Sequence, residues 1–385
     1  MKTFNYKSIF KLISKPVFLL SVVILASLIL SACTGGRTPL RGWAGVAVDG
    51  PNTVVGSMDG RVVSVNTATG AQNWSIPIQT PPSGGGFGCS SAPVSVVLFG
   101  SPAIDGDIVY IAGMNGKLYA ISSSTRLSKD VILRKDDKSN PGQLVSGVTV
   151  AEGKVYVGSS DGRVYALDTI PNLGIKWQFA TGDKIWSTPT VVGDTVYVTS
   201  FDKKIYALNA ADGSKKWEYK TQGALVSQPV VDGGTVYFGS LDRNLYALDA
   251  ATGSLKWSFS TVKESGKWFW ATPVVHNGTV YAANLDGKVY AVNASNGQKL
   301  TELNLSSASS ATPVEIGNQL FIATETGDIF SIDTATNTQK LLVSLGEKVY
   351  ASLFANEGKI YVHTFSDKLY EIEAASGAKR ELNIK

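Results

Sequence analysis

The sequence contains few of the residues from which metal centres, disulfide scaffolds and most nucleophilic active sites are built. Its 385 residues include two cysteines, Cys33 and Cys89, and two histidines, His276 and His363. One pair of cysteines cannot hold a disulfide-rich fold together, and two histidines argue against a histidine-based metal centre. Helical periodicity is also missing after the N-terminal region, which argues against a helical fold.

The chain lacks a strong excess of charge as well. Lysine and arginine number 35 against 31 acidic residues, and the surplus equals the four lysines Lys2, Lys7, Lys11 and Lys15. The rest of the chain is therefore neutral, without the basic surface that binds a phosphate backbone, and we expect no nucleic-acid partner. A hydrophobic content of 44% is enough for a large packed core, which excludes a disordered chain.

The N-terminus has the pattern of a bacterial export signal. The lysines at positions 2–15 precede an apolar stretch at 17–30, which is too short to span a bilayer and ends in Leu30-Ser31-Ala32-Cys33. This ending resembles the lipobox, in which the cysteine carries the lipid. We therefore predict a signal peptide at 1–32, palmitate-type acylation of Cys33 and a lipidated tether at 33–41. An uncleaved anchor and ordinary secretion are the alternatives.

The remainder of the chain is a repeat of about 40 residues. Two aromatic positions, nine residues apart, recur in eight copies with turn signals such as Asp161-Gly162 and Asp286-Gly287 between them. The first position holds Val54, Tyr110, Tyr156, Tyr197, Tyr237, Tyr281, Phe321 and Tyr361. A proline before most copies opens a short apolar run, and a tryptophan follows several copies. Four short strands per copy predict an all-β fold, an eight-bladed β-propeller of four-stranded antiparallel blades at 42–385.

The residue pattern of the repeat resembles a known family. The phrase Tyr-Ala-Leu-Asp-Ala-x-Thr-Gly-x-x-x-Trp at 246–257, with small changes at 206–217, is similar to the quinoprotein-type, or PQQ-like, propeller repeat. Together with the lipobox, eight such blades resemble the BamB family of lipoproteins. The resemblance implies a non-catalytic scaffold that binds other cell-envelope proteins beside the β-barrel assembly machinery. Thr34 after the lipobox cysteine implies the outer membrane where the source has one, and otherwise the outer face of the cytoplasmic membrane.

An enzyme is the main alternative, because quinone-dependent dehydrogenases share this repeat. Members of that family carry adjacent cysteines and a calcium site, and this chain has no adjacent cysteines. The repeated carboxylates are explained by turn chemistry: Asp161, Asp202, Asp242 and Asp286. We place His276 in an exposed loop and His363 in a strand. We therefore expect no catalytic residue, metal or cofactor, with a quinone-dependent or ligand-binding propeller as the alternative function.

Two repeat-equivalent positions, adjacent in the sequence, precede the first strand of each copy, which is the innermost strand of its blade. One is small in all copies, which fits crowding near the propeller axis. The other is aromatic in five copies and lies on the face that also carries the turns between the second and third strands. We predict that the partner-binding residues lie there, and alternatively that these rings pack between blades. The predicted residues are Trp43, Trp186, Trp270 and Tyr350 at this position, together with Trp268 and Phe269, which widen the aromatic surface. The insertions Thr80 to Gly100 and Ser122 to Ser146 are further candidates.

Overall fold

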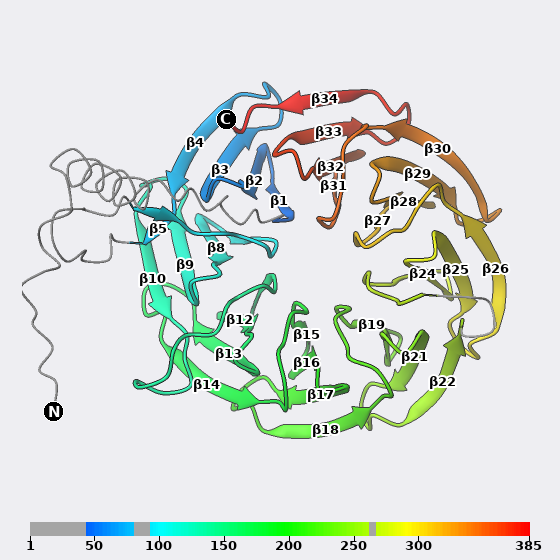
Figure 1. Ribbon diagram of the computed structural model, residues 1–385, viewed down its shortest axis with the longest axis horizontal. Helices are drawn as coiled ribbons and strands as arrows, with labels where there is room; N and C mark the ends of the chain where they lie inside the picture. Colours follow the sequence, from blue (N-terminus) through cyan, green and yellow to red (C-terminus); the bar gives the residue numbers. More distant parts are fainter. Residues whose placement is uncertain (1–43, 81–92, 262–266) are drawn as a thin grey trace, which may run out of the picture. The chain divides into compact units, whose positions relative to one another are not determined.

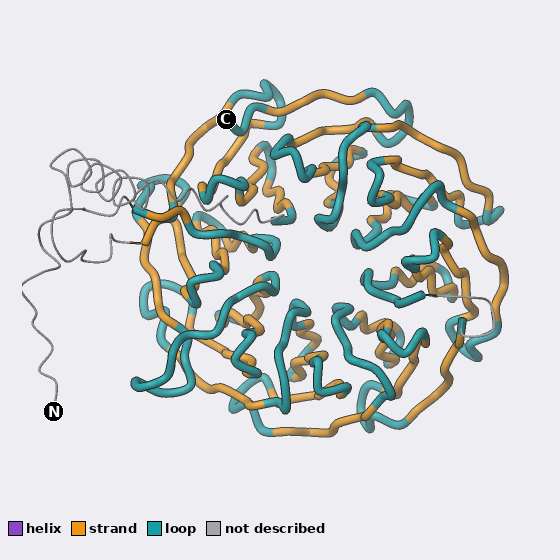
Figure 2. Tube along the Cα trace, in the orientation of Figure 1, coloured by secondary structure: helices purple, strands orange, loops and turns teal. Residues whose placement is uncertain are grey.

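The computed structural model describes residues 44–80, 93–261 and 267–385, which belong to one compact unit, Gly42–Lys385. Eight four-stranded antiparallel sheets are arranged as blades around a central axis (Figure 1). Strands and loops alone make up the described residues (Figure 2), and these contain no helix long and apolar enough to cross a membrane. The predicted eight-bladed β-propeller is confirmed. The predicted signal peptide and tether lie outside the described residues.

Each blade is formed by one continuous stretch of chain. Blade 1 comprises β1 (Val46–Asp49), β2 (Asn52–Gly56), β3 (Arg61–Asn66) and β4 (Gln72–Pro77). Blade 2 comprises β7 (Ala103–Asp105), β8 (Ile108–Ala112), β9 (Lys117–Ser122) and β10 (Ser128–Ile132). Blade 3 comprises β11 (Val148–Ala151), β12 (Lys154–Gly158), β13 (Arg163–Asp168) and β14 (Ile175–Ala180). Blade 4 comprises β15 (Thr190–Val192), β16 (Thr195–Thr199), β17 (Lys204–Asn209) and β18 (Lys215–Lys220).

The second half repeats the pattern. Blade 5 comprises β19 (Val230–Asp232), β20 (Thr235–Gly239), β21 (Asn244–Asp249) and β22 (Leu255–Ser260). Blade 6 comprises β23 (Val274–His276), β24 (Thr279–Ala283), β25 (Lys288–Asn293) and β26 (Lys299–Asn304). Blade 7 comprises β27 (Val314–Ile316), β28 (Gln319–Ala323), β29 (Asp328–Asp333) and β30 (Thr338–Ser344). Blade 8 comprises β31 (Phe354–Asn356), β32 (Lys359–His363), β33 (Leu369–Glu373) and β34 (Lys379–Leu382).

The two insertions differ from each other. A short ladder of β5 (Gln79–Thr80) and β6 (Val94–Ser95) flanks the first, whose residues 81–92 lie outside the described part. The second, Ser122 to Ser146, stands where other copies carry the tryptophan of the outer strand. It contains β10, at Ser128–Ile132, which is the outer strand of blade 2, and the residues after β10 form a loop. The polar sequence did not indicate this strand because its side chains are almost all exposed.

The carboxylates of the repeat stabilise the turn between the second and third strands in blades 3, 4, 5 and 6. In blade 4, Asp202 Oδ1 accepts the backbone N–H of Lys204, and Asp202 Oδ2 accepts the hydroxyl of Tyr206 at 2.6 Å. Burial, followed by this hydrogen bond, raises the pKa of Tyr206 well above its usual range. Asp161, Asp242 and Asp286 make the same pair of contacts. The structural interpretation of these four carboxylates is thus confirmed.

In blades 3, 4 and 5, a tyrosine, an alanine and a tryptophan lie side by side across the sheet and connect the blade to the next one. In blade 4 the small Ala207 pairs with both Tyr197 and Trp217, and the two rings lie 5.9 Å apart across it. The indole N–H of Trp217 and the hydroxyl of Tyr197 both donate to the carbonyl of Ala250 in blade 5. The indole also lies against Gly253, where a Cβ would approach it to 2.6 Å.

The same contact recurs between other blades. The indoles of Trp177 and Trp257 donate to Ala210 and Ala294, each in the following blade. In blade 6 a threonine replaces the tryptophan, and the hydroxyl of Tyr281 contacts both the carbonyl of Thr334 and the side chain of Asn337 in blade 7. Each hydrophobic core therefore spans two neighbouring blades, as radial repeats require.

The last and first blades, each complete in sequence, meet through side-chain contacts and through a backbone hydrogen bond from Asn383 N–H to Gly70 O at 3.1 Å. His363, which is buried, lies 2.9 Å from the carbonyl of Ala44 through Nδ1 and 3.0 Å from Asp367 Oδ1 through Nε2. Asp367 also accepts the backbone N–H of Met58. Figure 1 shows these blades side by side, blue next to red. His363 lies in a strand, β32, as expected, and the structure shows that it is packed between the last and first blades.

Candidate functional site: the axial pocket and the Trp268 groove

One face of the propeller combines the starts of the inner strands with the turns between the second and third strands. In successive blades, a backbone N–H in the turn between the second and third strands donates to a backbone carbonyl in the segment before the inner strand of the same blade. Examples are Leu241 N–H to Ala224 O at 3.0 Å and Glu325 N–H to Ala308 O at 2.8 Å. The prediction that these two features share a face is confirmed, and the site can be built from the successive residues of this segment.

A short apolar run, which a proline opens in most copies, begins each inner strand. The small residues two positions before the start of this run are structural, as expected. All eight are buried: Ala44, Gly100, Ser146, Ser187, Ser227, Ala271, Ala311 and Ala351. At Gly100 a Cβ would come within 2.0 Å of the carbonyl oxygen of Ser146 in the next blade. This crowding explains the absence of larger side chains at these eight described positions.

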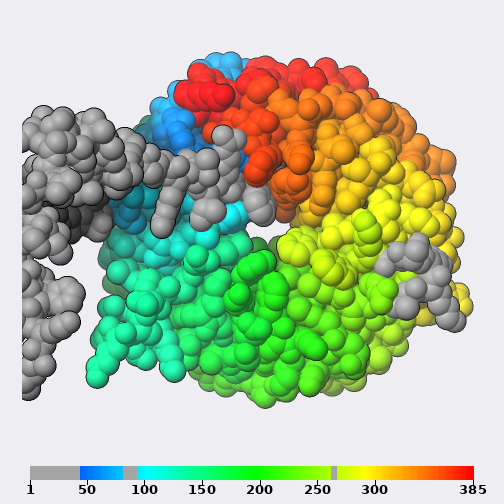
Figure 3. Space-filling view, viewed as in Figure 1, coloured from blue at the N-terminus to red at the C-terminus, as the bar shows by residue number. Residues whose placement is uncertain are grey.

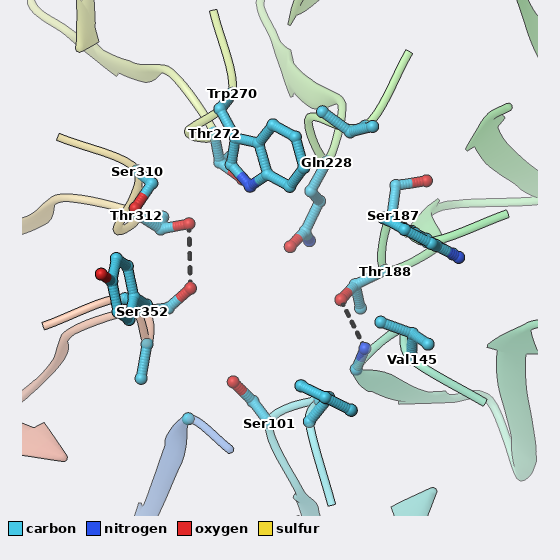
Figure 4. Close-up of a pocket in the computed structure, with 18 of the residues that line it drawn as sticks. Ser101, Val145, Ser187, Thr188, Gln228, Trp270, Thr272, Ser310, Thr312 and Ser352 are labelled. Carbon is cyan, nitrogen blue, oxygen red and sulfur yellow. Dashed lines mark hydrogen bonds between the residues drawn. The ribbon is translucent and has the colours of Figure 1, made fainter. Parts of the chain in front are cut away.

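The next residue in each copy faces the axis, and there the side chains are mostly hydroxyls. Figure 4 shows them converging on a central pocket. The members are Gly45, Ser101, Gly147, Thr188, Gln228, Thr272, Thr312 and Ser352. Ser352 donates to Thr312 at 3.0 Å, and the backbone N–H of Gly147 donates to Thr188 at 3.0 Å. We call these residues the hydroxyl ring.

Aromatic residues form the wall of the same pocket. Phe99, Trp186, Trp270 and Tyr350 line a cavity of about 330 Å³ at the axis, and the face is hollowed there in Figure 3. Trp186 is held by an edge contact with Phe201 at 4.7 Å, and its indole N–H donates to Ser160. These four rings stand partly exposed around the pocket, and Trp186 also packs between blades 3 and 4 through Ser160 and Phe201.

The axial pocket is uncharged: among the described residues that line it, none has a side chain that is charged at neutral pH. The lining consists of glycine, alanine, serine, threonine, glutamine, valine, methionine and the four aromatic residues. Within the described ranges, no group of histidine, cysteine, aspartate or glutamate residues could hold a metal ion. Pyrroloquinoline quinone is a polycarboxylate and would require cations or a bound metal here. The residues present do not fit that cofactor.

A second hollow lies on this face outside the axis, and we call it the Trp268 groove. It has a volume of about 630 Å³ and spans blades 5, 6 and 7. Its lining is Leu241, Asp242, Arg243, Lys267, Trp268, Leu285, Ala308 and Glu325. Trp268 is 49% exposed, and both signs of charge surround it. Asp242 already accepts the hydroxyl of Tyr246 and three backbone N–H groups, those of Gln222, Gly223 and Asn244.

The structure separates the residues that the sequence had grouped. Trp268 is exposed in the groove, whereas Trp186, Trp270 and Tyr350 line the axial pocket. The expected exposure of Phe269 is wrong: it is 1% exposed and packs in the core between blades 5 and 6. Trp43 lies outside the described residues.

The residues at the equivalent positions in other blades indicate that Phe269 is buried. These positions hold Leu98, Leu144, Ile185, Leu225, Ser309 and Val349, all buried and almost all apolar. The positions equivalent to Trp268 hold Val97, Gln143, Lys184, Ala224, Ala308 and Lys348, none of them buried. An alternation of buried and accessible residues therefore runs through this segment, and Trp268 stands at an accessible position.

His276 also differs from expectation. It was placed in an exposed loop, but it ends strand β23 and its side chain is 10% exposed. Its Nδ1 lies 2.7 Å from Glu315 Oε1 in blade 7, so it joins two inner strands. The sequence suggested a loop because Asn277-Gly278 follows directly.

Comparison with known proteins identifies the repeat. A family model described as outer membrane protein assembly factor BamB matches residues 33–171, 171–319 and 307–380. The assembly factor BamB of Nitrosomonas eutropha is 31% identical over 114 residues, 30% of this chain and 26% of that protein. BamB of Moranella endobia is 28% identical over 120 residues, 30% of this chain and 31% of that protein. The matched stretches thus span about a third or less of these relatives.

Solved structures extend the likeness of fold to the whole ring. The crystal structure of BamB from Moraxella catarrhalis superposes with a TM-score of 0.70 at 18% identity, covering 86% of this chain and 97% of that one. A computationally designed protein, Ika8, superposes with a TM-score of 0.69 at 15% identity, covering 87% of this chain and 97% of that one.

A further sequence relative is an enzyme. The beta-alanine-activating enzyme of Danio rerio is 28% identical over 151 residues, 33% of this chain and only 12% of the enzyme.

Proposed function

The chain belongs to the family of the outer membrane protein assembly factor BamB, and from this premise we propose that it is a lipid-anchored, non-catalytic scaffold of outer-membrane protein assembly. It holds a protein of the β-barrel assembly machinery through the Trp268 groove. The lipid on Cys33 keeps this face near the membrane where assembly takes place. Acyl chains contribute about 0.8 kcal/mol per buried methylene, so several chains suffice for a stable anchor.

The exposed indole of Trp268 is the observation that carries the proposal. Tryptophan is among the residues that contribute most to protein interfaces, and a half-exposed indole on a rigid ring loses little conformational entropy on binding. Other blades carry lysine, glutamine, valine or alanine at this position. The tryptophan therefore has no role that the fold itself requires.

The charges around the indole define the kind of partner segment that fits. Arg243 and Lys267 in the lining of the groove are exposed cations, and Glu325 adds a partly exposed carboxylate. A segment with an apolar side chain for Trp268, flanked by charges of both signs, complements this surface. Such rim charges affect the association rate and specificity more than the affinity.

Site-specific photocrosslinking in native membranes tests the contact. A photoreactive amino acid at position 268 should crosslink to a component of the assembly machinery, and the same amino acid at Leu341 serves as control. Leu341 is 54% exposed on the outer strand β30, away from the groove. Crosslinks of equal yield at both positions, or none at 268, would contradict the proposal.

A substitution separates binding from folding. Trp268→Ser should reduce copurification of the partner while leaving the melting temperature nearly unchanged, because surface substitutions shift stability by about 0.5 kcal/mol or less. Phe269→Ser is the matched comparison: it should lower stability by several kcal/mol through a core cavity, about 3–5 for a large aromatic side chain. A Trp268→Ser protein that keeps its partner would refute the groove as the contact.

A further inference from the structure

We propose that the axial pocket is a binding site for a neutral carbohydrate, such as the end of an uncharged glycan. This site is separate from the Trp268 groove, and the inference does not depend on the proposed scaffold function. Three features of the pocket lead to it: the absence of charge on its described lining residues, the aromatic wall and the unpaired hydrogen-bonding groups.

The absence of charge defines the class of ligand. All described lining side chains of the axial pocket are uncharged, although the chain has 35 basic and 31 acidic residues. A site for an anion or a cation would place an opposite charge or a metal beside it, because an unpaired charge in a partly desolvated pocket is costly. The ligand should therefore be neutral.

The aromatic wall and the hydroxyl ring together suit a sugar. The indole of Trp270 and the ring of Trp186 border the cavity, and the residues of the hydroxyl ring line it with them (Figure 4). A pyranose has apolar C–H faces that pack on aromatic rings, and hydroxyl groups that both donate and accept hydrogen bonds. Serine and threonine hydroxyls have the same dual capacity. A purely apolar ligand would leave them unpaired.

Unpaired polar groups point to the same conclusion. Within the described part of the chain, the buried Ser310 Oγ has no hydrogen-bond partner, and Ser310 lines the pocket. The indole N–H of Trp270 has none among the described residues either, whereas those of Trp177, Trp186, Trp217 and Trp257 are all bonded. Figure 4 shows the Trp270 nitrogen and the amide of Gln228 directed into the cavity, and the Gln228 amide nitrogen also donates to Thr190 Oγ1 at 3.3 Å. Polar groups that line a cavity normally find partners, so the Trp270 indole N–H and the Gln228 amide oxygen are available to a ligand.

The dimensions agree with a small ligand. A volume of about 330 Å³ lies at the lower end of the range of small-molecule pockets, which runs from about 300 to 1,000 Å³. Such a space accommodates one or two sugar rings. An extended peptide would need a longer row of edge hydrogen bonds, and the inner strands of these blades contain only three or four residues.

Titration with neutral trisaccharides tests the proposal. Cellotriose, maltotriose and triacetylchitotriose are added to the purified lipid-free protein, up to about 10 mM because single sugar sites are weak. Tryptophan fluorescence and saturation-transfer NMR are the two readouts. We expect at least one trisaccharide to bind, with Trp270→Ala weakening it about tenfold or more and Gln228→Ala weakening it severalfold.

Control variants and control ligands show whether the sugar binds in the axial pocket. Trp268→Ala, outside the pocket, should leave sugar binding unchanged, and thermal melting verifies that each variant folds. If Trp270→Ala does not fold, Gln228→Ala and Thr272→Val provide the same comparison. A blocked neutral tripeptide and pyrroloquinoline quinone are titrated in parallel. The proposal is overturned if no trisaccharide binds, if pocket variants bind as well as the wild type, or if only the peptide or the quinone binds.

Discussion

Replacing Trp217 with alanine removes a buried contact between blades 4 and 5 that combines packing with a hydrogen bond. The indole is 8% exposed, packs against Gly253 and donates to the carbonyl of Ala250 at 3.0 Å. Truncating a buried tryptophan costs about 3–5 kcal/mol through lost burial and the cavity that remains. The carbonyl of Ala250 still accepts the hydroxyl of Tyr197, so it is not left unpaired. We therefore expect a loss of about 3–5 kcal/mol, without a further penalty for an orphaned acceptor.

Trp217→Phe separates the two parts of this contact. A phenyl ring retains much of the packing on Gly253 but cannot donate to Ala250. The loss should then be smaller, about 1–2 kcal/mol, for one hydrogen bond and an incompletely filled site. Trp268→Ala is the matched control, because it removes an indole that is 49% exposed.

Urea unfolding followed by far-ultraviolet circular dichroism measures these differences without relying on the substituted tryptophan for the signal. Coincident transitions at several wavelengths verify that the ring unfolds as one unit. A Trp217→Ala loss under about 1 kcal/mol, or a Trp268→Ala loss equal to it, would refute the assignment of Trp217 as the contact between blades.

Three further predictions concern anchoring and pH. Cys33→Ala should abolish incorporation of labelled palmitate, and equal labelling of both proteins would contradict the lipobox. The raised pKa of Tyr206 means that its contribution to stability is complete below the usual tyrosine pKa and declines above about pH 10; Tyr206→Phe should flatten that decline in urea midpoints. Burial opposes ionisation of Asp367, but His363 and the Met58 N–H lower its pKa overall. Its contribution should therefore be lost below about pH 4, and Asp367→Asn should remove this acid-dependent part of the unfolding curve.

The sequence alone determined the architecture of this protein, because a 40-residue period repeats the same local signals. Turn signals such as Asp202 with Tyr206 define a hairpin locally, and a tryptophan such as Trp217 requires a neighbouring blade to cover it. Eight copies therefore specify eight blades without knowledge of any distant contact. The irregular blade 2, with its polar outer strand at Ser128–Ile132, could not be predicted in this way, since exposed residues carry no hydrophobic pattern.

The tertiary structure decided which side of each segment faces the core, the groove or the axis. Trp268, Phe269 and Trp270 are neighbours in sequence, yet they lie in the groove, the core and the axial pocket respectively. The backbone direction before the inner strand separates them, and that direction depends on packing against the adjacent blade. The axial pocket likewise exists only after closure, because its hydroxyl ring assembles from residues about 40 positions apart along the chain. Local periodicity cannot specify a cavity whose wall requires the first and last blades to meet.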